Sequence, residues 1–266
     1  MKALYARAIP KKRTAGMVER ARESWYNKGI THKEGSGMSF GQNLQFLRKM
    51  RNMTQEELAE KMRVSRQTVS KWELDAVYPE VPKITDLCAL FSCSMDQLVR
   101  EEMNVLNDAY SDIREEWVEP MRYISHIVVS AMPEGDAIDR VTAWAKKLEI
   151  KEPYIIGWDF PVLSQEQINV YNMHGYTAAL VLPEGMDVEV LDVRMLKQER
   201  QKYMAITIRE PFIAPFQLIP NAYKALMTYM RTNAIGHRQD KNTIACFEHD
   251  YTRDGVEYMD IFIAAE

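Results

Sequence analysis

The sequence predicts two domains: a small all-α domain of five helices, and after it an α+β domain built from two pseudo-symmetric strand-helix-strand-strand repeats. Its 266 residues suffice for two hydrophobic cores. Up to about residue 103, the apolar residues recur at helical spacing. Beyond residue 120, short apolar runs alternate with helical stretches, and the same order of elements occurs twice.

The composition is that of an ordinary globular protein, with 46% hydrophobic and 27% charged residues. No apolar run is long enough to span a bilayer, and the N-terminus lacks the apolar region of a secretory signal. The three cysteines, Cys88, Cys93 and Cys246, form an odd and scattered set. These features predict a cytoplasmic protein with no disulfide framework and no membrane partner.

The net charge of −4 is unevenly distributed along the chain. Residues 1–37 hold 9 Lys and Arg against 3 Asp and Glu, and residues 38–103 hold 9 against 10. Residues 104–266 hold 16 against 25, a formal charge of −9. This acidic region is better suited to cations or neutral molecules than to phosphates.

Residues 1–37 are basic and poor in periodic apolar residues, so we expect a disordered extension. It could act as a basic arm that grips phosphates. Alternatively, the natural protein starts at Met38, because codons for the preceding run Lys33-Glu34-Gly35 can spell a purine-rich ribosome-binding sequence. Under either hypothesis, the first domain is expected to span residues 39–103.

The stretch 54–73, TQEELAEKMRVSRQTVSKWE, predicts two short helices joined by a turn. Thr54 and Glu57 form a capping box that opens the first helix, and Ser65 caps the second. Val69 and Trp72 lie three residues apart in the second helix, so both can face the first helix. The side chains left exposed are of the kinds that bond base edges in the major groove. They are Arg66, Gln67, Thr68, Ser70 and Lys71.

Three further helices complete the small domain, and their apolar residues follow helical spacing. These residues are Phe40, Leu44 and Leu47, then Ile84, Leu87, Cys88 and Phe91, and finally Met95, Leu98 and Val99. With QEELAEKMRVSRQTVSKWE as the matching run, the five-helix unit resembles the XRE family of lambda-repressor/Cro-type helix-turn-helix regulators.

The resemblance implies that double-stranded operator DNA is a partner. It also implies that Gln55 bonds a backbone phosphate, and that the major groove is met by Ser65, Arg66, Gln67, Ser70 and Lys71. The alternative is a merely solvated helix face, but two capped helices at this spacing favour DNA binding. The lack of a strongly basic surface argues against tight non-specific binding. Because such domains read operator half-sites, we also expect the protein to form a homodimer.

Residues 104–121 are expected to form a helical connector. Leu106, Tyr110, Ile113 and Trp117 fall on one narrow apolar stripe, which ends before Pro120. The stripe could pack on the C-terminal domain, which is the option we favour, or form the seam of a dimer.

The second domain is expected to span residues 122–266. Its first repeat comprises a strand at 123–132, a helix at 135–150, a strand at 153–160 and a long strand or hairpin at 168–183. Its second repeat comprises a strand at 202–210, a helix at 215–233 and strands at 242–250 and 256–266. Such repeats pair into an antiparallel sheet with helices on one face, leaving a groove between the halves.

Four runs in this region, IIGWDF, VYNMHGYTAALVL, KYMAITIREPF and CFEHDYTRDGVEYMDIFIA, resemble the GyrI-like effector-binding domain of AraC-type regulators. The run LKQERQKYMAI departs from the family, which has a Pro-Ala-Gly-Lys/Arg-Tyr turn there, so the boundary between the repeats is left open. The resemblance implies a pocket between the repeats, in which a glutamate, here Glu248, attracts cationic and aromatic small molecules.

The other expected ligand-binding residues are Trp158, Asp159, Tyr171, Tyr176, Phe216 and Phe247. Strand alternation places Phe247 and Glu248 on opposite faces, so both can line one cavity only if the strand bulges or lies at an edge. Glu248 is therefore the preferred ligand residue. The alternatives are a surface carboxylate at Glu248, a loop residue at Asp159, and aromatic side chains that belong to the core.

Other chemistry finds little support in the sequence. The histidines show no metal-ligand spacing, no Gly-rich phosphate loop occurs, and Cys246 and His249 point to opposite faces of their strand. We therefore expect no cofactor, no metal and no catalytic residue, and predict a ligand-responsive transcription regulator. One alternative is a hydrolase that uses Glu248 and Tyr171, and another is a ligand-free protein-interaction module.

Overall fold

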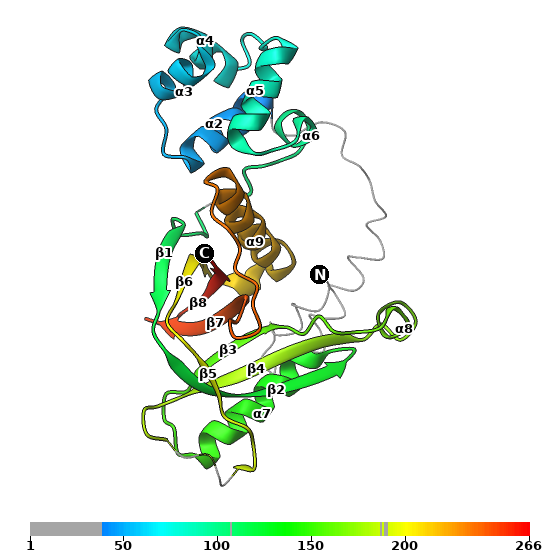
Figure 1. Ribbon diagram of the computed structural model, residues 1–266. Coiled ribbons are helices and arrows are strands. Elements are labelled where there is room, and N and C mark those ends of the chain that lie inside the picture. Colours follow the sequence, from blue (N-terminus) through cyan, green and yellow to red (C-terminus); the bar gives the residue numbers. More distant parts are fainter. Residues whose placement is uncertain (1–38, 107, 187, 189–190) are drawn as a thin grey trace. The chain divides into compact units, whose positions relative to one another are not determined.

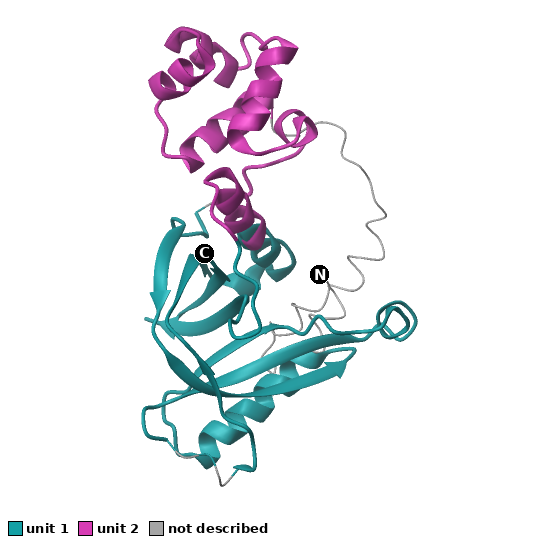
Figure 2. Cartoon of the chain, viewed as in Figure 1, with its two compact units in different colours: residues 1–14, 108–222, 237–266 teal, residues 15–107, 223–236 magenta. Residues whose placement is uncertain are grey.

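The computed structural model describes residues 39–106, 108–186, 188 and 191–266 (Figure 1). The predictions for residues 1–37 lie outside the described residues. The described chain divides into two compact units (Figure 2). The helical unit holds residues 39–106 and 223–236, and the sheet unit holds residues 108–222 and 237–266.

The helical unit contains the five helices that the sequence predicts for residues 39–103. They are α2 (Phe40–Met50), α3 (Gln55–Met62), α4 (Arg66–Glu73), α5 (Val81–Phe91) and α6 (Met95–Val99). Capping boxes open α2, α3 and α6, where Ser39, Thr54 and Ser94 bond the backbone three residues further on. The core residues lie at the predicted apolar positions and are at most 3% exposed. They include Phe40, Leu44, Leu47, Leu58, Val69, Trp72, Leu87, Phe91 and Leu98.

One polar side chain, Asn43, lies fully buried inside this apolar core. Its amide nitrogen donates to the carbonyl oxygens of Leu98, at 3.1 Å, and Glu101, at 2.8 Å. Its oxygen accepts from the backbone nitrogen of Met103 at 3.2 Å. Because a buried amide without partners is costly, these bonds fix the position of α2 against the end of α6.

Helix α9 (Pro215–Thr232) contributes its last turns to the helical unit, since the division falls after Ala222. Within that unit, the Thr232 hydroxyl donates to the carbonyl oxygen of Phe91 at 3.2 Å. The amide nitrogen of Asn233 donates to the carbonyl oxygen of Met50 at 3.0 Å. These bonds satisfy carbonyl groups at the C-terminal ends of α5 and α2, which have no partner within their own helices.

The sheet unit is built on one eight-stranded sheet in the order β1-β6-β8-β7-β3-β4-β2-β5, and its paired strands are antiparallel. The strands are β1 (Arg114–Val118), β2 (Met121–Ser130), β3 (Tyr154–Asp159), β4 (His174–Leu182), β5 (Leu196–Gln198), β6 (Gln201–Arg209), β7 (Cys246–Arg253) and β8 (Val256–Ala264). The helices are α7 (Pro133–Lys147), α8 (Gln165–Asn169) and the first part of α9, with a short 3-10 helix at Pro211–Ile213.

Chain order confirms the predicted pair of repeats. The first is β2-α7-β3-β4 and the second is β6-α9-β7-β8, so each runs strand, helix, strand, strand. The two halves of the sheet join where β3 pairs with β7, with Gly157 opposite Glu248. The predicted fold class, five helices followed by an α+β domain of two such repeats, is therefore confirmed.

Two predicted elements differ from the structure. No helix occurs among the described residues of the expected connector, 104–106 and 108–121; instead, residues 114–118 form β1, which pairs with β6. The hydrogen-bond ladder along the edge of β6 outweighs the helical spacing of the apolar stripe. The stretch 168–183 is not one strand either, because α8 includes its first residues, opened by a capping box at Ser164, and β4 begins only at His174.

The two faces of the sheet bury different side chains. One face lies against α7, which contacts β2 and β4 (Figure 1), and buries residues such as Ile124, Tyr176 and Leu180. The opposite face holds an aromatic and aliphatic cluster. Its buried members are Ile156, Ala179, Tyr203, Ala205, Ile244, Phe247, Phe262 and Ala264. We call the first the helix face and the second the cluster face.

Gly157 has no space for a side chain. A Cβ atom at this position would lie 1.9 Å from the hydroxyl oxygen of Tyr176, whose ring leans over the glycine from β4. Tyr176 is fully buried, so it has no open volume into which it could swing. Close packing at the junction of the two half-sheets therefore requires glycine on β3.

We expect the substitution Gly157→Ala to lower the free energy of unfolding by about 1–3 kcal/mol, as overpacking of a core does. Gly135→Ala is the matched control, because a Cβ atom there meets nothing within 4 Å and the residue lies in α7. Alanine should stabilise that helical position by about 0.5–1 kcal/mol. Urea unfolding followed by tryptophan fluorescence compares the two variants, and equal effects would show that Tyr176 does not constrain Gly157.

Candidate functional site

Helices α3 and α4 form a two-helix unit with a tight turn. Arg63 adopts the left-handed conformation, with φ of 53°, and ends α3. The Ser65 hydroxyl accepts from the backbone nitrogen of Thr68 at 3.1 Å and so opens α4. Val69 and Trp72 are buried, which turns the opposite side of α4 to solvent. The predicted orientation of the second helix is therefore observed.

The predicted DNA-contacting side chains fall into two groups. Arg66, Gln67 and Lys71 are exposed, whereas Thr68 and Ser70 are half-buried. The hydroxyls of Ser65 and Thr68 lie 2.9 Å apart and bond each other. Arg66, Gln67 and Lys71 are thus the side chains of α4 that are most accessible to a partner.

The Arg66 guanidinium forms an ion pair with Glu56 at 3.1 Å, and both side chains are more than half exposed. An exposed pair of this kind contributes only about 0–1 kcal/mol. Arg66 can therefore exchange this partner for a base edge or a phosphate at little cost.

Gln55 is tied to a buried ion pair beneath α3 and α4. Arg48 of α2 bonds both carboxylate oxygens of Glu73, at 2.5 and 3.0 Å. The Gln55 amide nitrogen donates to the same carboxylate at 2.9 Å. Side chains of three helices thus meet at one carboxylate, and Arg48 also donates to the carbonyl oxygen of Met53, just before α3, at 2.7 Å. This arrangement fixes the Gln55 side chain at the start of α3 and leaves its second amide hydrogen for another acceptor.

In the sheet unit, Glu248 lies on the helix face of β7 and is 1% exposed. Strand pairing places Gly157 opposite it, and Tyr176 covers Gly157 from the next strand. Asp159 and Cys246 lie two residues along β3 and β7 on the same face. The structure therefore brings Glu248, Asp159 and Tyr176 to one junction between the repeats.

Cys246 lies beside both carboxylates of this junction and is half-buried. Burial, together with the nearby carboxylates of Glu248 and Asp159, raises the pKa of Cys246 to about 11. The thiol is therefore protonated at neutral pH and is a poor nucleophile. The same negative field favours a bound cation.

Two predicted pocket residues lie on the cluster face instead. Phe247 stacks on Phe262 with ring centroids 4.5 Å apart and meets Tyr203 edge-on at 5.2 Å. Trp158 is packed against the same cluster and meets Tyr123 edge-on at 6.3 Å. The strand does not bulge, so alternation keeps both rings away from the face that carries Glu248. Their assignment to a pocket with Glu248 is therefore corrected: they are core residues of the opposite face.

The two remaining predicted aromatic residues are more exposed. Tyr171 is 58% exposed and its hydroxyl lies 3.3 Å from Glu166 of α8, beyond the end of the β3-β4 pair (Figure 1). Phe216, in the first turn of α9, is 53% exposed. Tyr171 therefore does not share the junction around Glu248.

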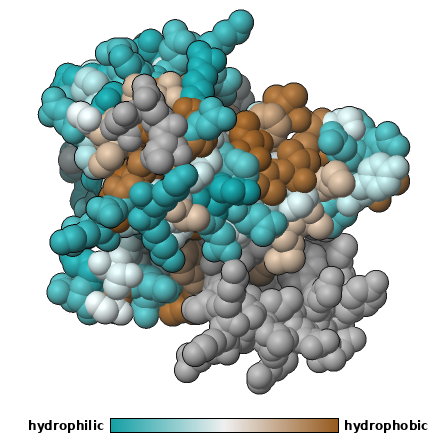
Figure 3. Space-filling model, turned by 90° about the horizontal axis from the view of Figure 1, so that it is seen from below, coloured by the Kyte–Doolittle hydropathy of each residue, from teal (hydrophilic) through white to brown (hydrophobic). Residues whose placement is uncertain are grey.

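Apolar areas also reach the surface elsewhere. Figure 3 shows them in brown among hydrophilic residues on the side of the molecule that it draws.

One buried carboxylate was missed by the sequence reasoning. Glu134, the second residue of α7, is fully buried. In the sequence it reads as an ordinary acidic residue of a first helical turn, where a negative charge is favourable near the helix N-terminus. Nothing local distinguishes it from an exposed residue, because its burial depends on the packing of α7 on the sheet.

In the described part of the chain, no group of three or more His, Cys, Asp and Glu residues could hold a metal ion. No described helix is both long and apolar enough to cross a membrane.

Residues 44–98 match the family model described as Helix-turn-helix, so this part of the chain is a helix-turn-helix domain of the XRE type. The chain is 42% identical over 65 residues to the HTH-type transcriptional activator BcrR of Enterococcus faecalis. That match covers 24% of this chain and 32% of BcrR, so the chain spans about a third of the length of this curated relative.

Three solved structures are also similar. The EcmrR-DNA complex is 12% identical and covers 84% of this chain and 81% of its own, with a TM-score of 0.41. SAV2435 bound to tetraphenylphosphonium is 11% identical and covers 59% and 94%, with a TM-score of 0.37. A transcriptional regulator from Listeria innocua is 30% identical and covers 23% and 57%, with a TM-score of 0.23.

Removal of the buried Glu73 carboxylate should destabilise the helical unit far more than removal of the exposed Glu56 carboxylate. We expect Glu73→Ala to cost about 3–5 kcal/mol, because it leaves the Arg48 guanidinium buried without its partner. The control, Glu56→Ala, removes the exposed partner of Arg66 and should cost at most about 1 kcal/mol. Denaturant unfolding followed by circular dichroism tests this, and similar losses for both variants would contradict the buried network.

Proposed function

We propose that this protein is a ligand-responsive transcription regulator. It reads operator DNA through α4 and senses a small cationic or aromatic molecule at the junction around Glu248. The observation that carries the proposal is that one chain joins a helix-turn-helix domain to an α+β unit that buries a carboxylate between two repeats. The residue roles that follow are part of this proposal.

The DNA side rests on the chemistry that α4 exposes. Arg66 and Lys71 can donate to guanine or to phosphate, and Gln67 can pair with both edges of adenine. Gln55, held by Glu73 at the start of α3, has a free amide hydrogen that can donate to a backbone phosphate. Ser65 and Thr68 already bond each other, so they position the helix as well as contact DNA.

The size of the reading helix suggests a homodimer. Helix α4 has 8 residues, which cover a single half-site in one major groove. Two copies of the chain reading half-sites about 34 Å apart would supply the contact area that specific binding requires.

The sensing side rests on burial and charge at the junction between the repeats. Glu248 is 1% exposed, and the surrounding sequence from residue 104 onward is acidic, so the junction favours positive charge. Tyr176 and the aliphatic residues of the helix face are buried and make this face apolar and aromatic. A lipophilic cation suits this combination, because its charge meets Glu248 and its bulk replaces water.

Base contacts by α4 can be tested on operator fragments selected from genomic DNA by the purified protein. We expect Gln67→Ala and Lys71→Ala to weaken the preference for the selected operator over scrambled DNA by about 1–3 kcal/mol. Lys151→Ala is the control, since it removes one exposed positive charge from the sheet unit. Fluorescence anisotropy gives the affinities. An equal loss on operator and scrambled DNA would instead assign these side chains to phosphates.

Sensing can be tested by thermal unfolding with tetraphenylphosphonium and related lipophilic cations. We expect saturable stabilisation of the wild-type protein and its loss in Glu248→Gln, which keeps the shape and removes the charge. Glu257→Gln, an exposed position on β8, should behave as wild type. Stabilisation that persists in Glu248→Gln would contradict the role of this carboxylate, and product formation from the compounds would support the hydrolase alternative.

A further inference from the structure

A ladder of aromatic rings runs across the side of the sheet opposite Glu248. Tyr154 of β3 meets His249 of β7 at 4.0 Å, and His249 stacks on Tyr251 at 5.6 Å and 22°. Tyr251 in turn stacks on Tyr258 of β8 at 5.5 Å and 17°. The ladder follows from strand geometry, because His249 and Tyr251 are two residues apart and Tyr251 lies directly opposite Tyr258.

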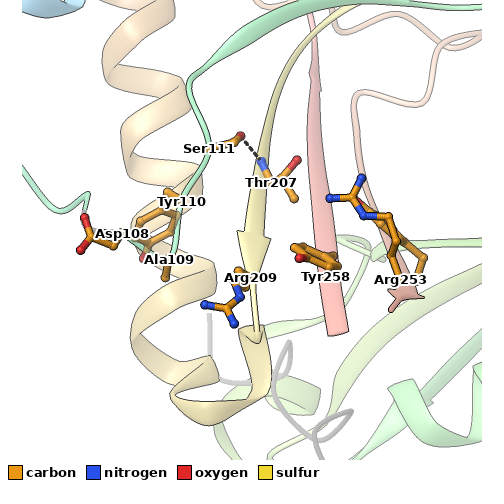
Figure 4. Close-up of a pocket in the computed structure, with 9 residues that line it drawn as sticks. Asp108, Ala109, Tyr110, Ser111, Thr207, Arg209, Arg253 and Tyr258 are labelled. Carbon is orange, nitrogen blue, oxygen red and sulfur yellow. Dashed lines mark hydrogen bonds between the residues drawn. The ribbon is translucent and has the colours of Figure 1, made fainter. Parts of the chain in front are cut away.

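The ladder ends in an open pocket of about 280 Å³ on the sheet unit (Figure 4). Tyr258 and Arg209 both line it, and Arg209 lies opposite Tyr258 on β6. The Arg253 guanidinium lies 5.1 Å from the centre of the Tyr258 ring. Ser111 and Thr207, which bond each other at 2.9 Å, line another part of the wall.

The charges around the pocket leave its two arginines available. Within the described residues Arg253 makes no ion pair, and Arg209 has only an exposed contact with Glu210, at 3.7 Å. Asp108 is the one acidic residue in the pocket lining, and it is exposed.

A third arginine on this face of the sheet, Arg114, is already paired with carboxylates, unlike the two arginines at the pocket. Arg114 bonds Glu116 at 2.8 Å and Asp260 at 3.2 Å. Burial raises the pKa of Tyr251, so its phenol is neutral at pH 7 and does not repel an anion. Positive charge therefore concentrates at the end of the ladder that carries Arg209 and Arg253.

We propose that this pocket is a second small-molecule site, which binds an aromatic carboxylate. The carboxylate lies between Arg209 and Arg253, and its ring extends the stack formed by Tyr258 and Tyr251. Two guanidinium groups match the planar geometry of a carboxylate, and parallel tyrosine rings offer a flat surface for a planar ligand. The volume is below the roughly 300–1,000 Å³ of sites for drug-sized ligands, which favours a single-ring acid.

This site is independent of the function proposed above. It lies on the other face of β7 from Glu248 and has the opposite charge preference. A protein with both sites would respond to a cation through one face of its sheet and to an acid through the other.

The test is a titration of the full chain with benzoate, followed by calorimetry and by ligand-observed NMR. We expect saturable binding that weakens at least tenfold in Arg253→Gln and in Arg209→Gln. Both arginines are exposed, so their loss should not unfold the protein. Arg200→Gln is the matched control, because Arg200 makes a comparable contact with a ring, 4.2 Å over Trp117, outside the pocket. This control and Glu248→Gln should bind benzoate as wild type does.

Acetate and inorganic phosphate separate an aromatic-acid site from a general anion site. Each should bind at least tenfold more weakly than benzoate, because neither has a ring to stack on Tyr258. The proposal is overturned if benzoate shows no saturable binding up to millimolar concentrations. It is also overturned if acetate or phosphate binds as well as benzoate, or if Arg253→Gln binds benzoate as tightly as Arg200→Gln.

Discussion

The sheet unit depends on the contact of Tyr176 with Gly157. The two repeats share one sheet because β3 can pair with β7, and this pairing lies under a tyrosine ring that leaves no volume for a Cβ atom. The same pair of strands places Glu248 opposite the glycine, so the packing constraint also sets the position of the buried carboxylate. Fold and candidate site are thus consequences of one close approach between a ring and a backbone.

In the helical unit, a buried polar network fixes the positions of the helices. The Glu73 carboxylate bonds Arg48 and Gln55, so the last residue of α4 is bonded to the preceding helix α3 and to helix α2. A hydrophobic core alone tolerates small rotations of one helix on another, whereas a buried charge needs its partners at fixed angles. The exposed face of α4 therefore has a defined direction.

The sequence predicts well what local chemistry determines. The caps at Thr54 and Ser65 and the buried side of α4 follow from patterns within a few residues. The two repeats follow from the order of such patterns along the chain. Alternation along β7 already separates Phe247 from Glu248. The failures are non-local. Residues 114–118 become a strand because the edge of β6 is available, and the burial of Glu134 comes from the packing of α7 on the sheet. No pattern within either segment contains that information.

Alternation along β7 has a consequence for how this chain can change over evolution. Even-numbered residues from Cys246 to Asp250 face one side of the sheet, and Phe247, His249 and Tyr251 face the other. Substitutions can therefore alter either face while leaving the other intact. An insertion or deletion of a single residue before Phe247 would exchange the two sets and place a carboxylate in the aromatic cluster. Strand β7 can therefore change on one face by substitution without altering the other face, but a change of its length would disrupt both faces.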